Sequence, residues 1–408
     1  MMGLFRWELK KIWSPGILAV LLLLGVVYYW MFPYFYIEYF NNGPYEEADF
    51  QLASGWVEKY GPTMESEERA ELDGQLAEEI LKFDQQIATI PEAVTAGLTG
   101  YDTFLLFREK SYSDAADAGG QADMNVEALI QRVYGGTNWY IIHELKAYLE
   151  HYDSQAEIQG IILKQTTGEW GDHSDAMIQR EKDLAAPNQG NSLLPGGVQH
   201  STVEYGKRLA VWCVLSVVLL LSPTLVRDRL RGIRSMQWSS WCGRSILNTQ
   251  MAAALFSGVI LTAINLIVYA IPFLAQGSLQ FRDCGLGKIW GGGSYSWFDW
   301  SYGTYILILT ALIIALALAA AGLTVFLSQY SGNYISMLMK SLPLFVVLGA
   351  VLGSWLLDNP FYFRRLWSVT TGPWLPRGTE GVVAIGLLLI SVGLCISACK
   401  RQMKREMR

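Results

Sequence analysis

The stretch HELKAYLEH is the first place to look for chemistry, because it puts two histidines and two acids on one expected helix, namely His143, Glu144, Glu150 and His151. A zinc-binding HExxH helix sets its two histidines four residues apart on one face. Here His143 shares a face with Glu150 at a spacing of seven, which is typical of an exposed helix surface. His173 and His200 stand alone in expected loops, so no Ser–His–Asp or Cys–His arrangement can be built. We expect no catalytic or metal site in this chain.

A site for the phosphates of ATP is often marked in a sequence by the glycine-rich pattern GxxxxGK[ST], whose backbone amides bind the phosphates. The nearest candidates are Lys207 in YGKR and Lys288 in LGKI, and neither has the first glycine or the Ser/Thr. If the protein uses ATP, the nucleotide and its Mg²⁺ must therefore be bound by another polypeptide. We expect no cofactor in this chain itself.

Lys340 is the one charged residue inside the long apolar runs, and an intramembrane base is a functional-site candidate by default. It could line a substrate path. It lies about one and a half turns from the expected cytoplasmic end of its run, however, which is close enough for the ammonium to reach the headgroups. We favour this second interpretation. The runs otherwise carry no polar constellation that a particular solute would demand.

Charge is segregated along the 408 residues, of which 51% are hydrophobic and 17% charged. Residues 38–204 hold 30 Asp and Glu against 10 Lys and Arg, and the remainder holds 7 against 21. This division indicates an acidic aqueous domain and a basic membrane part. Because the bases cluster at the ends of the apolar runs, the pattern argues against a nucleic-acid-binding protein.

Six apolar runs predict six transmembrane helices, at residues 15–37, 209–226, 247–275, 304–327, 335–357 and 381–399. Residues 1–14 predict an amphipathic helix in the cytoplasmic interface, with a signal peptide as the less favoured alternative because the first run is too long and no cleavage site follows it. The start, the tail 400–408 and the loop 227–246 are all basic, so the positive-inside rule puts them in the cytoplasm. The fold class is therefore all-α, with residues 205–408 carrying spans two to six.

The acidic segment 38–204 predicts a mainly helical extracellular domain between the first two spans. One seam, ending at Pro91, repeats every three or four residues through Leu72, Leu76, Ile80, Phe83, Ile87 and Ile90. Further helical patterns cover 101–110, 138–152 and 153–165, and residues 114–120 and 187–197 are typical of loops. Of the five cysteines only Cys284 would face outside, so no disulfide framework is expected.

The loop RDRLRGIRSMQWSSWCGR, which runs from Arg227 to Arg244, is the strongest candidate for an interaction site. It offers apolar and aromatic anchors beside arginines, a composition typical of protein interfaces, namely Ile233, Arg234, Met236, Trp238 and Trp241. We favour docking of a cytosolic partner. The alternative is that the tryptophans sit at the headgroups while the arginines only set the topology.

The same loop carries a family resemblance. Asp228-x-x-x-Gly232, then Ser239-Ser240 and Gly243-Arg244, is similar to the acidic-x-x-x-Gly…Ser…Gly-Arg pattern of the membrane subunits of ATP-binding-cassette transporters, type 2 exporter class, of Gram-positive bacteria, with Asp in place of the more usual Glu. The opening FRWELKKIW and the order of spans also resemble that family. The resemblance implies a multi-pass permease in the bacterial plasma membrane, paired with an identical or sister subunit. It also implies that the loop docks on a cytosolic ATPase dimer that binds ATP and Mg²⁺.

The resemblance implies a permease that works as an exporter, with no enzymatic activity of its own. The apolar, aromatic-rich runs favour an amphipathic or hydrophobic substrate, such as a peptide, a lipid-like molecule or a drug, over an ion. Exporters of the class that the chain resembles often confer resistance to antimicrobial peptides. An alternative is a sensing or immunity module whose acidic outer domain binds a cationic antimicrobial peptide. A scaffold without transport is a third possibility.

Overall fold

The computed structural model describes residues 2–117, 123–164, 179, 183, 192–232, 246–286, 298–357 and 378–405. The chain divides into two compact units. The first unit comprises Met1–Phe40, Val198–Arg282 and Ser294–Arg408, and the second comprises Asn41–Gly197 and Asp283–Gly293. The sequence placed the inserted domain at 38–204, whereas residues 198–204 belong to the first unit, since they continue directly into its long helix.

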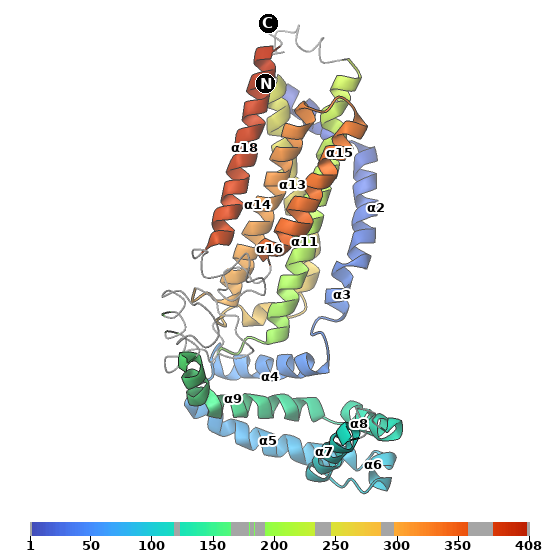
Figure 1. The fold of residues 1–408 in the computed structure, drawn as a ribbon, viewed down its shortest axis with the longest axis vertical. Coiled ribbons are helices and arrows are strands. Elements are labelled where there is room, and N and C mark those ends of the chain that lie inside the picture. Colours follow the sequence, from blue (N-terminus) through green and yellow to red (C-terminus); the bar gives the residue numbers. More distant parts are fainter. Residues whose placement is uncertain are drawn as a thin grey trace. The chain divides into compact units, whose positions relative to one another are not determined.

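Helices account for nearly all of the described part of the first unit, and they lie side by side as a bundle (Figure 1). In chain order they are α1 (Met2–Ile12), α2 (Pro15–Met31), α3 (Pro33–Glu38), α11 (Gly196–Leu230), α13 (Ile246–Leu274), α14 (Tyr302–Gln329), α15 (Tyr334–Phe345), α16 (Gly353–Leu357) and α18 (Thr379–Arg405). A 3₁₀ turn, η3 (Ser278–Phe281), follows α13, and a π-helical segment, η4 (Val346–Leu352), joins α15 to α16. α14 packs against both α13 and α18.

Five of these helices, or helix runs, are long and apolar enough to cross a membrane, which indicates a multi-pass membrane protein. They cover the five expected runs from 209–226 to 381–399, except that the helix of the run 247–275 ends one residue earlier, at Leu274. The first expected run is divided: α2 ends at Met31, Pro33 begins α3, and α1 meets α2 at a bend of 45°. Because proline has no backbone N–H to donate, it starts a new helix here. The described helices therefore give five spans, or six if α1 and α2 together form a broken one.

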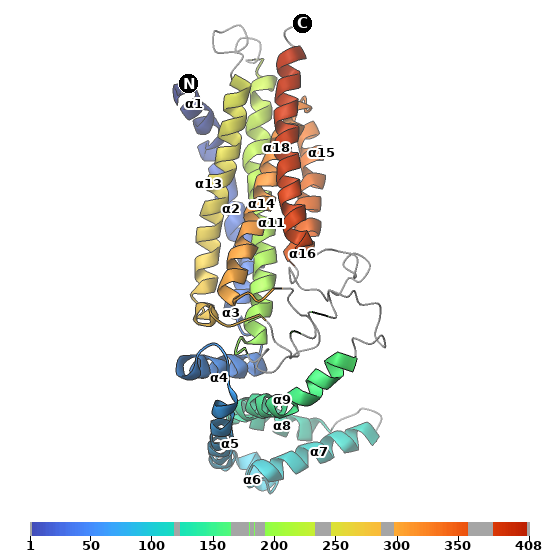
Figure 2. The same ribbon diagram turned by 90° about the vertical axis from the view of Figure 1, so that its left-hand side faces the viewer.

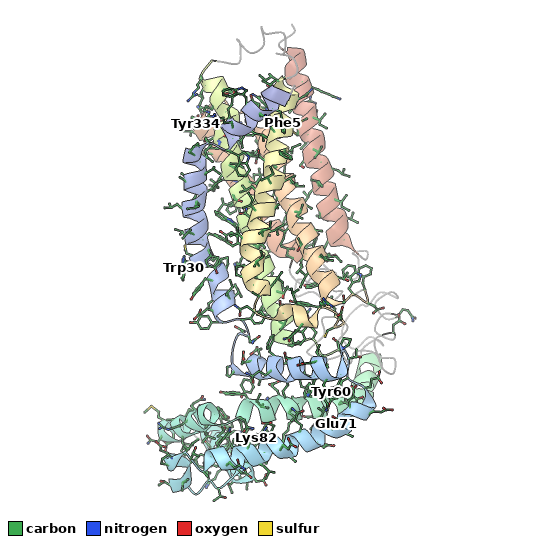
Figure 3. The ribbon with its side chains drawn as sticks, turned by 180° about the vertical axis from the view of Figure 1, so that it is seen from behind. Phe5, Trp30, Tyr60, Glu71, Lys82 and Tyr334 are labelled. Carbon is green, nitrogen blue, oxygen red and sulfur yellow. The ribbon has the colours of Figure 1, made fainter. Side chains whose placement is uncertain are left out.

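Aromatic side chains lie exposed toward both ends of the bundle. Figure 3 shows Phe5 and Tyr334 toward the end where α1 and the close of α18 lie, and Trp30 farther along α2. Tyr334 is 46% exposed and Trp30 is 60% exposed. α1 and the end of α18 lie at the same end of the bundle (Figure 2). Exposed tyrosine and tryptophan near helix ends are typical of the two membrane interfaces.

Small residues let α14 approach its neighbours closely. A Cβ built on Gly322 of α14 would lie 2.9 Å from Ser391 Oγ and 3.2 Å from the Ser391 carbonyl carbon, on α18. At the neighbouring position of α14, a Cβ on Gly258 of α13 would lie 3.0 Å from the Cβ of Ala321. Since lipid provides no hydrophobic drive for helix association, contacts of this kind supply the packing energy.

The second unit is also helical in its described part, with α4 (Pro44–Tyr60), α5 (Ser66–Ile87), α6 (Pro91–Thr95), α7 (Tyr101–Asp117), α8 (Met124–Gly136) and α9 (Trp139–Lys164). The predicted seam is confirmed: Leu72, Phe83, Ile87 and Ile90 are buried, and Leu76 and Ile80 are partly buried. One expectation was wrong: α7 continues to Asp117, whereas a loop was expected from residue 114. The helical patterns at 138–152 and 153–165 are confirmed over Trp139–Lys164, where they form one continuous helix, α9. No glycine or proline interrupts α9 before residue 160, so the helix has no reason to break there.

Trp139 lies at the centre of the second unit's core. Its ring stacks on Tyr134 at a centroid distance of 5.1 Å and on Tyr101 at 5.9 Å, and it meets the edge of Phe104 at 5.3 Å. These rings come from α7, α8 and α9. Polar side chains fix the helix starts around them, since Asp84 accepts the Tyr101 amide at 2.7 Å and so holds the beginning of α7.

Candidate functional site

The predicted docking face of the basic loop lies outside the described residues, which end at Gly232 and resume at Ile246. This applies to Ile233, Arg234, Met236, Trp238, Trp241 and Arg244. The structure does describe the place from which the loop starts, including Asp228 and Gly232. The candidate site is therefore the root of the loop, made by the end of α11, the start of α13 and α1.

Asp228 is the centre of a polar network at this root. Its Oδ2 accepts a hydrogen bond from Lys11 Nζ at 2.7 Å and another from Gln250 Nε2 at 3.2 Å. Lys11 Nζ also donates to Glu8 Oε1 at 2.8 Å. One ammonium thus joins two carboxylates, one from α1 and one from α11, while the amide adds α13.

The network is partly withdrawn from solvent. The side chain of Glu8 is 6% exposed, that of Asp228 14% and that of Lys11 27%. Arg227 adds a hydrogen bond from Nη2 to the backbone oxygen of Lys11 at 3.3 Å. Removing one partner from such a pair leaves the other charge in a poorly solvated place, which is more costly than losing an exposed pair.

Gly232 explains how the chain leaves α11. Its φ is +65°, in the left-handed region that residues with a Cβ rarely adopt. A glycine in this conformation just after the last helical residue is a common helix terminator. Gly232, four residues after Asp228, is therefore needed for the direction in which the loop departs.

α1 is held against the start of α13 by contacts beside the network. The ring of Phe5 lies 5.8 Å from that of Phe256, and the indole of Trp13, which follows α1, donates to Ser257 Oγ at 3.0 Å. The loop root is consequently a joint of three helices, so displacing the loop would act on α1, α11 and α13 together.

Lys340 lies in a different place, on the second turn of α15. Its Nζ donates to the backbone oxygen of Tyr330 at 2.7 Å and lies 3.5 Å from Ser331 Oγ. Tyr330 caps the end of α14, where helix carbonyls lack intrahelical partners. A cation here stabilises the helix end. This contact favours a structural role for Lys340 in joining α14 to α15 over a role in a substrate path.

A buried polar cluster inside the bundle was missed by the sequence analysis, which expected no such constellation in the spans. Asn265 of α13 accepts a hydrogen bond from Trp212 Nε1 at 3.1 Å and donates one to Ser216 Oγ at 2.8 Å, both on α11. Four residues along α13, Tyr269 donates to the backbone oxygen of Gly25 on α2 at 2.9 Å. We call these side chains the polar seam, namely Trp212, Ser216, Asn265 and Tyr269. Asn265 could have indicated it, as a carboxamide within an apolar run.

The acids and histidines of the HELKAYLEH stretch lie on α9. His143 Nδ1 is 3.2 Å from Glu144 Oε1, and Glu150 is exposed. The described residues contain no group of three side chains that could hold a metal ion. His173 lies outside the described residues. His200 was expected in a loop, but it is exposed on α11, because that helix already begins at Gly196.

Comparison with known proteins gives no relative from which to transfer a function. No family model, no curated protein and no solved structure matches this chain.

Proposed function

We propose that this chain is the membrane subunit of an ATP-driven exporter of the type 2 class, which moves an amphipathic or hydrophobic substrate outward. ATP and Mg²⁺ are bound by a separate cytosolic ATPase dimer, which docks on the loop 227–246. The permease pairs with a second permease subunit in a bacterial plasma membrane, with both chain ends in the cytoplasm. The second unit is the extracellular domain in this arrangement.

The observation that carries the proposal is the Glu8–Lys11–Asp228–Gln250 network at the root of the loop. A docking loop can drive transport only if its movement also moves the membrane-spanning helices. Here the loop leaves from a joint of α1, α11 and α13, and the polar seam ties α11 to α13 further along. A push on the loop therefore moves several helices as one body. The ATPase drives this movement by docking more tightly on one conformation than on the other.

The experiment is affinity purification of the full chain from its native host. We expect an ATP-binding-cassette ATPase to co-purify and to hydrolyse ATP with Mg²⁺. Substituting Arg234, Trp238 and Trp241 together by alanine should abolish co-purification, since aromatic and arginine anchors dominate such interfaces. The same number of alanines at exposed positions Leu106, Tyr112 and Met124 is the matched control and should not change it.

Two outcomes would overturn the proposal. One is a purified complex without an ATPase, which would favour a scaffold. The other is unchanged ATPase co-purification and unchanged transport in the triple loop variant, which would show that the loop is not the docking site.

A second candidate function rests on the acidity of the segment 38–204, with its excess of 20 acids over bases. A sensing or immunity module would use this surface to attract a cationic antimicrobial peptide. Liposomes that contain the chain and its ATPase separate the two functions. A cationic peptide that stimulates ATP hydrolysis and accumulates across the bilayer indicates export, whereas binding without either indicates sensing.

A further inference from the structure

One face of α1 is left open when the helix packs on α13. Glu8 and Ile12 are buried, at 5% and 2% exposure, on the side that meets the bundle. Arg6, Trp7 and Lys10 are exposed on the other side, and Trp7 is 64% exposed. Residues spaced by three and four share a helix face, so these three side chains form one continuous surface. We call it the outer face of α1.

This face combines cations with an indole and carries no acid. The only acid of α1 is Glu8, which is buried and paired with Lys11. Lys10 Nζ lies 5.6 Å from the centre of the Trp7 ring, so the ammonium and the indole occupy one patch. Arg6 lies one residue before the indole and four before Lys10.

The side chains of the outer face of α1 indicate which ligand would bind there. An exposed tryptophan is most stable at the level of the headgroups, where the ring is dehydrated and its N–H stays wet. Two cations beside it at that depth are complementary to anionic headgroups, and basic residues near a membrane surface contribute additively to the attraction. A soluble anion would pair with the cations but would gain nothing from the indole.

We propose that the outer face of α1 binds the headgroups of anionic phospholipids, and that this binding holds α1 where Lys11 reaches Asp228. Lys10 and Lys11 are consecutive, so they point about 100° apart around the helix and contact different surroundings. Lys10 belongs to the lipid face, whereas Lys11 is 2.7 Å from Asp228 and offers its backbone oxygen to Arg227. Anionic lipid bound to the outer face of α1 therefore stabilises the contact between Lys11 and Asp228 at the root of the loop. The inference needs only the membrane location of the bundle and does not depend on transport or on an ATPase.

The test is hydrogen exchange of the full chain in nanodiscs of phosphatidylcholine alone and of phosphatidylcholine with phosphatidylglycerol. We expect the amides of α1 and of the first turns of α13 to exchange more slowly when phosphatidylglycerol is present. The double substitution Arg6→Gln and Lys10→Gln should remove most of this lipid-dependent slowing, by about tenfold or more in exchange rate, given what two basic residues contribute at a membrane surface. The exchange rates in phosphatidylcholine alone should stay close to those of the wild type.

Two matched variants make the result specific. Lys400→Gln with Arg401→Gln removes two exposed cations from α18 at the same end of the bundle, and should keep the lipid response. Arg6→Lys with Lys10→Arg keeps the charges, and should also keep it, which guards against a folding defect in the glutamine variant.

Three results would overturn the proposal. Equal protection in the two lipid mixtures would show that the headgroup charge is not recognised. Equal loss in the α18 variant would show diffuse attraction of the whole basic end. Protection by soluble glycerol phosphate in phosphatidylcholine nanodiscs would show a site for a free anion rather than for a lipid.

Discussion

The core of the second unit is built around one cluster of aromatic rings, whereas the helices of the first unit also meet through close glycine contacts and buried hydrogen bonds, beside aromatic pairs such as Tyr205 and Phe273. Trp139 of α9 packs against rings of α7 and α8 in the second unit. Gly322 lets α14 touch α18 in the first, and Asn265 joins α13 to α11. Close glycine contacts and interhelical hydrogen bonds are expected to matter more in the first unit, since water drives the burial of apolar surface but lipid does not.

The largest effect is expected for Trp139→Ala in the second unit. Removing a fully packed tryptophan costs about 3–5 kcal/mol, because the cavity cannot close completely. Hydrogen exchange of the full chain should show loss of protection in α7, α8 and α9 while α13 and α14 keep theirs. Leu106→Ala, at a position 67% exposed on α7, is the control and should change little. Equal loss in both units would break the comparison, since it would mean that one core supports the whole chain.

The next largest effect is expected for Gly322→Val in the first unit. The added side chain would meet both the hydroxyl and the backbone of Ser391, so α14 and α18 must separate. Overpacking of this kind costs about 1–3 kcal/mol. Thermal unfolding in one detergent should show a clear drop in midpoint. Gly386→Val on α18 makes the same change where no atom lies within 4 Å of the new Cβ, and a similar drop there would instead indicate helix propensity.

A smaller effect is expected for Asn265→Leu. The substitution leaves the Trp212 N–H and the Ser216 hydroxyl without their partner, and interhelical hydrogen bonds in membranes contribute about 0.6–2 kcal/mol. Combining it with Trp212→Phe completes a double-mutant cycle, in which the double variant should lose less stability than the sum of the two single variants, by an amount of that size. A coupling energy of zero would mean that the hydrogen bond between Trp212 and Asn265 adds no stability beyond the packing of the two side chains.

The smallest effect is expected from acid acting on the surface of the second unit. The Arg69 guanidinium holds the pKa of the Asp153 carboxyl below its ordinary value, and the hydrogen bond from Lys59 does the same to the pKa of Glu71, with Tyr60 adding a second. Lowered carboxyl pKa values stabilise the fold above the unfolded pKa values, near pH 4, and this contribution is lost as the pH falls through the folded ones. Both pairs are exposed, so the wild type and Arg69→Gln should differ only slightly in denaturation midpoint at pH 7 and not at all near pH 2. A large difference at pH 7 would mean that surface pairs matter more here than the core.

The features that depend on neighbouring residues in the sequence, such as span length and helix period, were predicted from the sequence. The length of an uncharged run is fixed by bilayer thickness, so five expected spans are found as long helices. The seam ending at Pro91 follows from one helix period, and it is buried as predicted. The division of the first run at Pro33 was also readable from proline chemistry, although the run was interpreted as continuous.

Contacts between distant helices were not predictable from these patterns. Lys11 and Asp228 are 217 positions apart, and Trp212 and Asn265 are 53 apart. Which face of each helix meets its neighbour depends on the rotation of both, and apolar runs that are hydrophobic all round carry no signal for it. Asp228 and Gly232 were found through the family resemblance. The docking role of Ile233, Arg234, Met236, Trp238, Trp241 and Arg244 stays a prediction, because they lie outside the described residues.

In the span that contains the π-helical segment η4, the number of residues determines which way the side chains after it point. A π turn closes its hydrogen bonds one residue later than an α turn, so Val346–Leu352 fixes the rotation of α16 about the helix axis relative to α15. Deleting one residue there would leave an apolar run of spanning length but turn α16 by about 100° relative to α15. Gly353, whose Cβ position lies 3.9 Å from the Cβ of Ala210 and 4.0 Å from Leu316 Cδ1, would then face elsewhere. This span tolerates exchange of one aliphatic residue for another more readily than insertion or deletion of one.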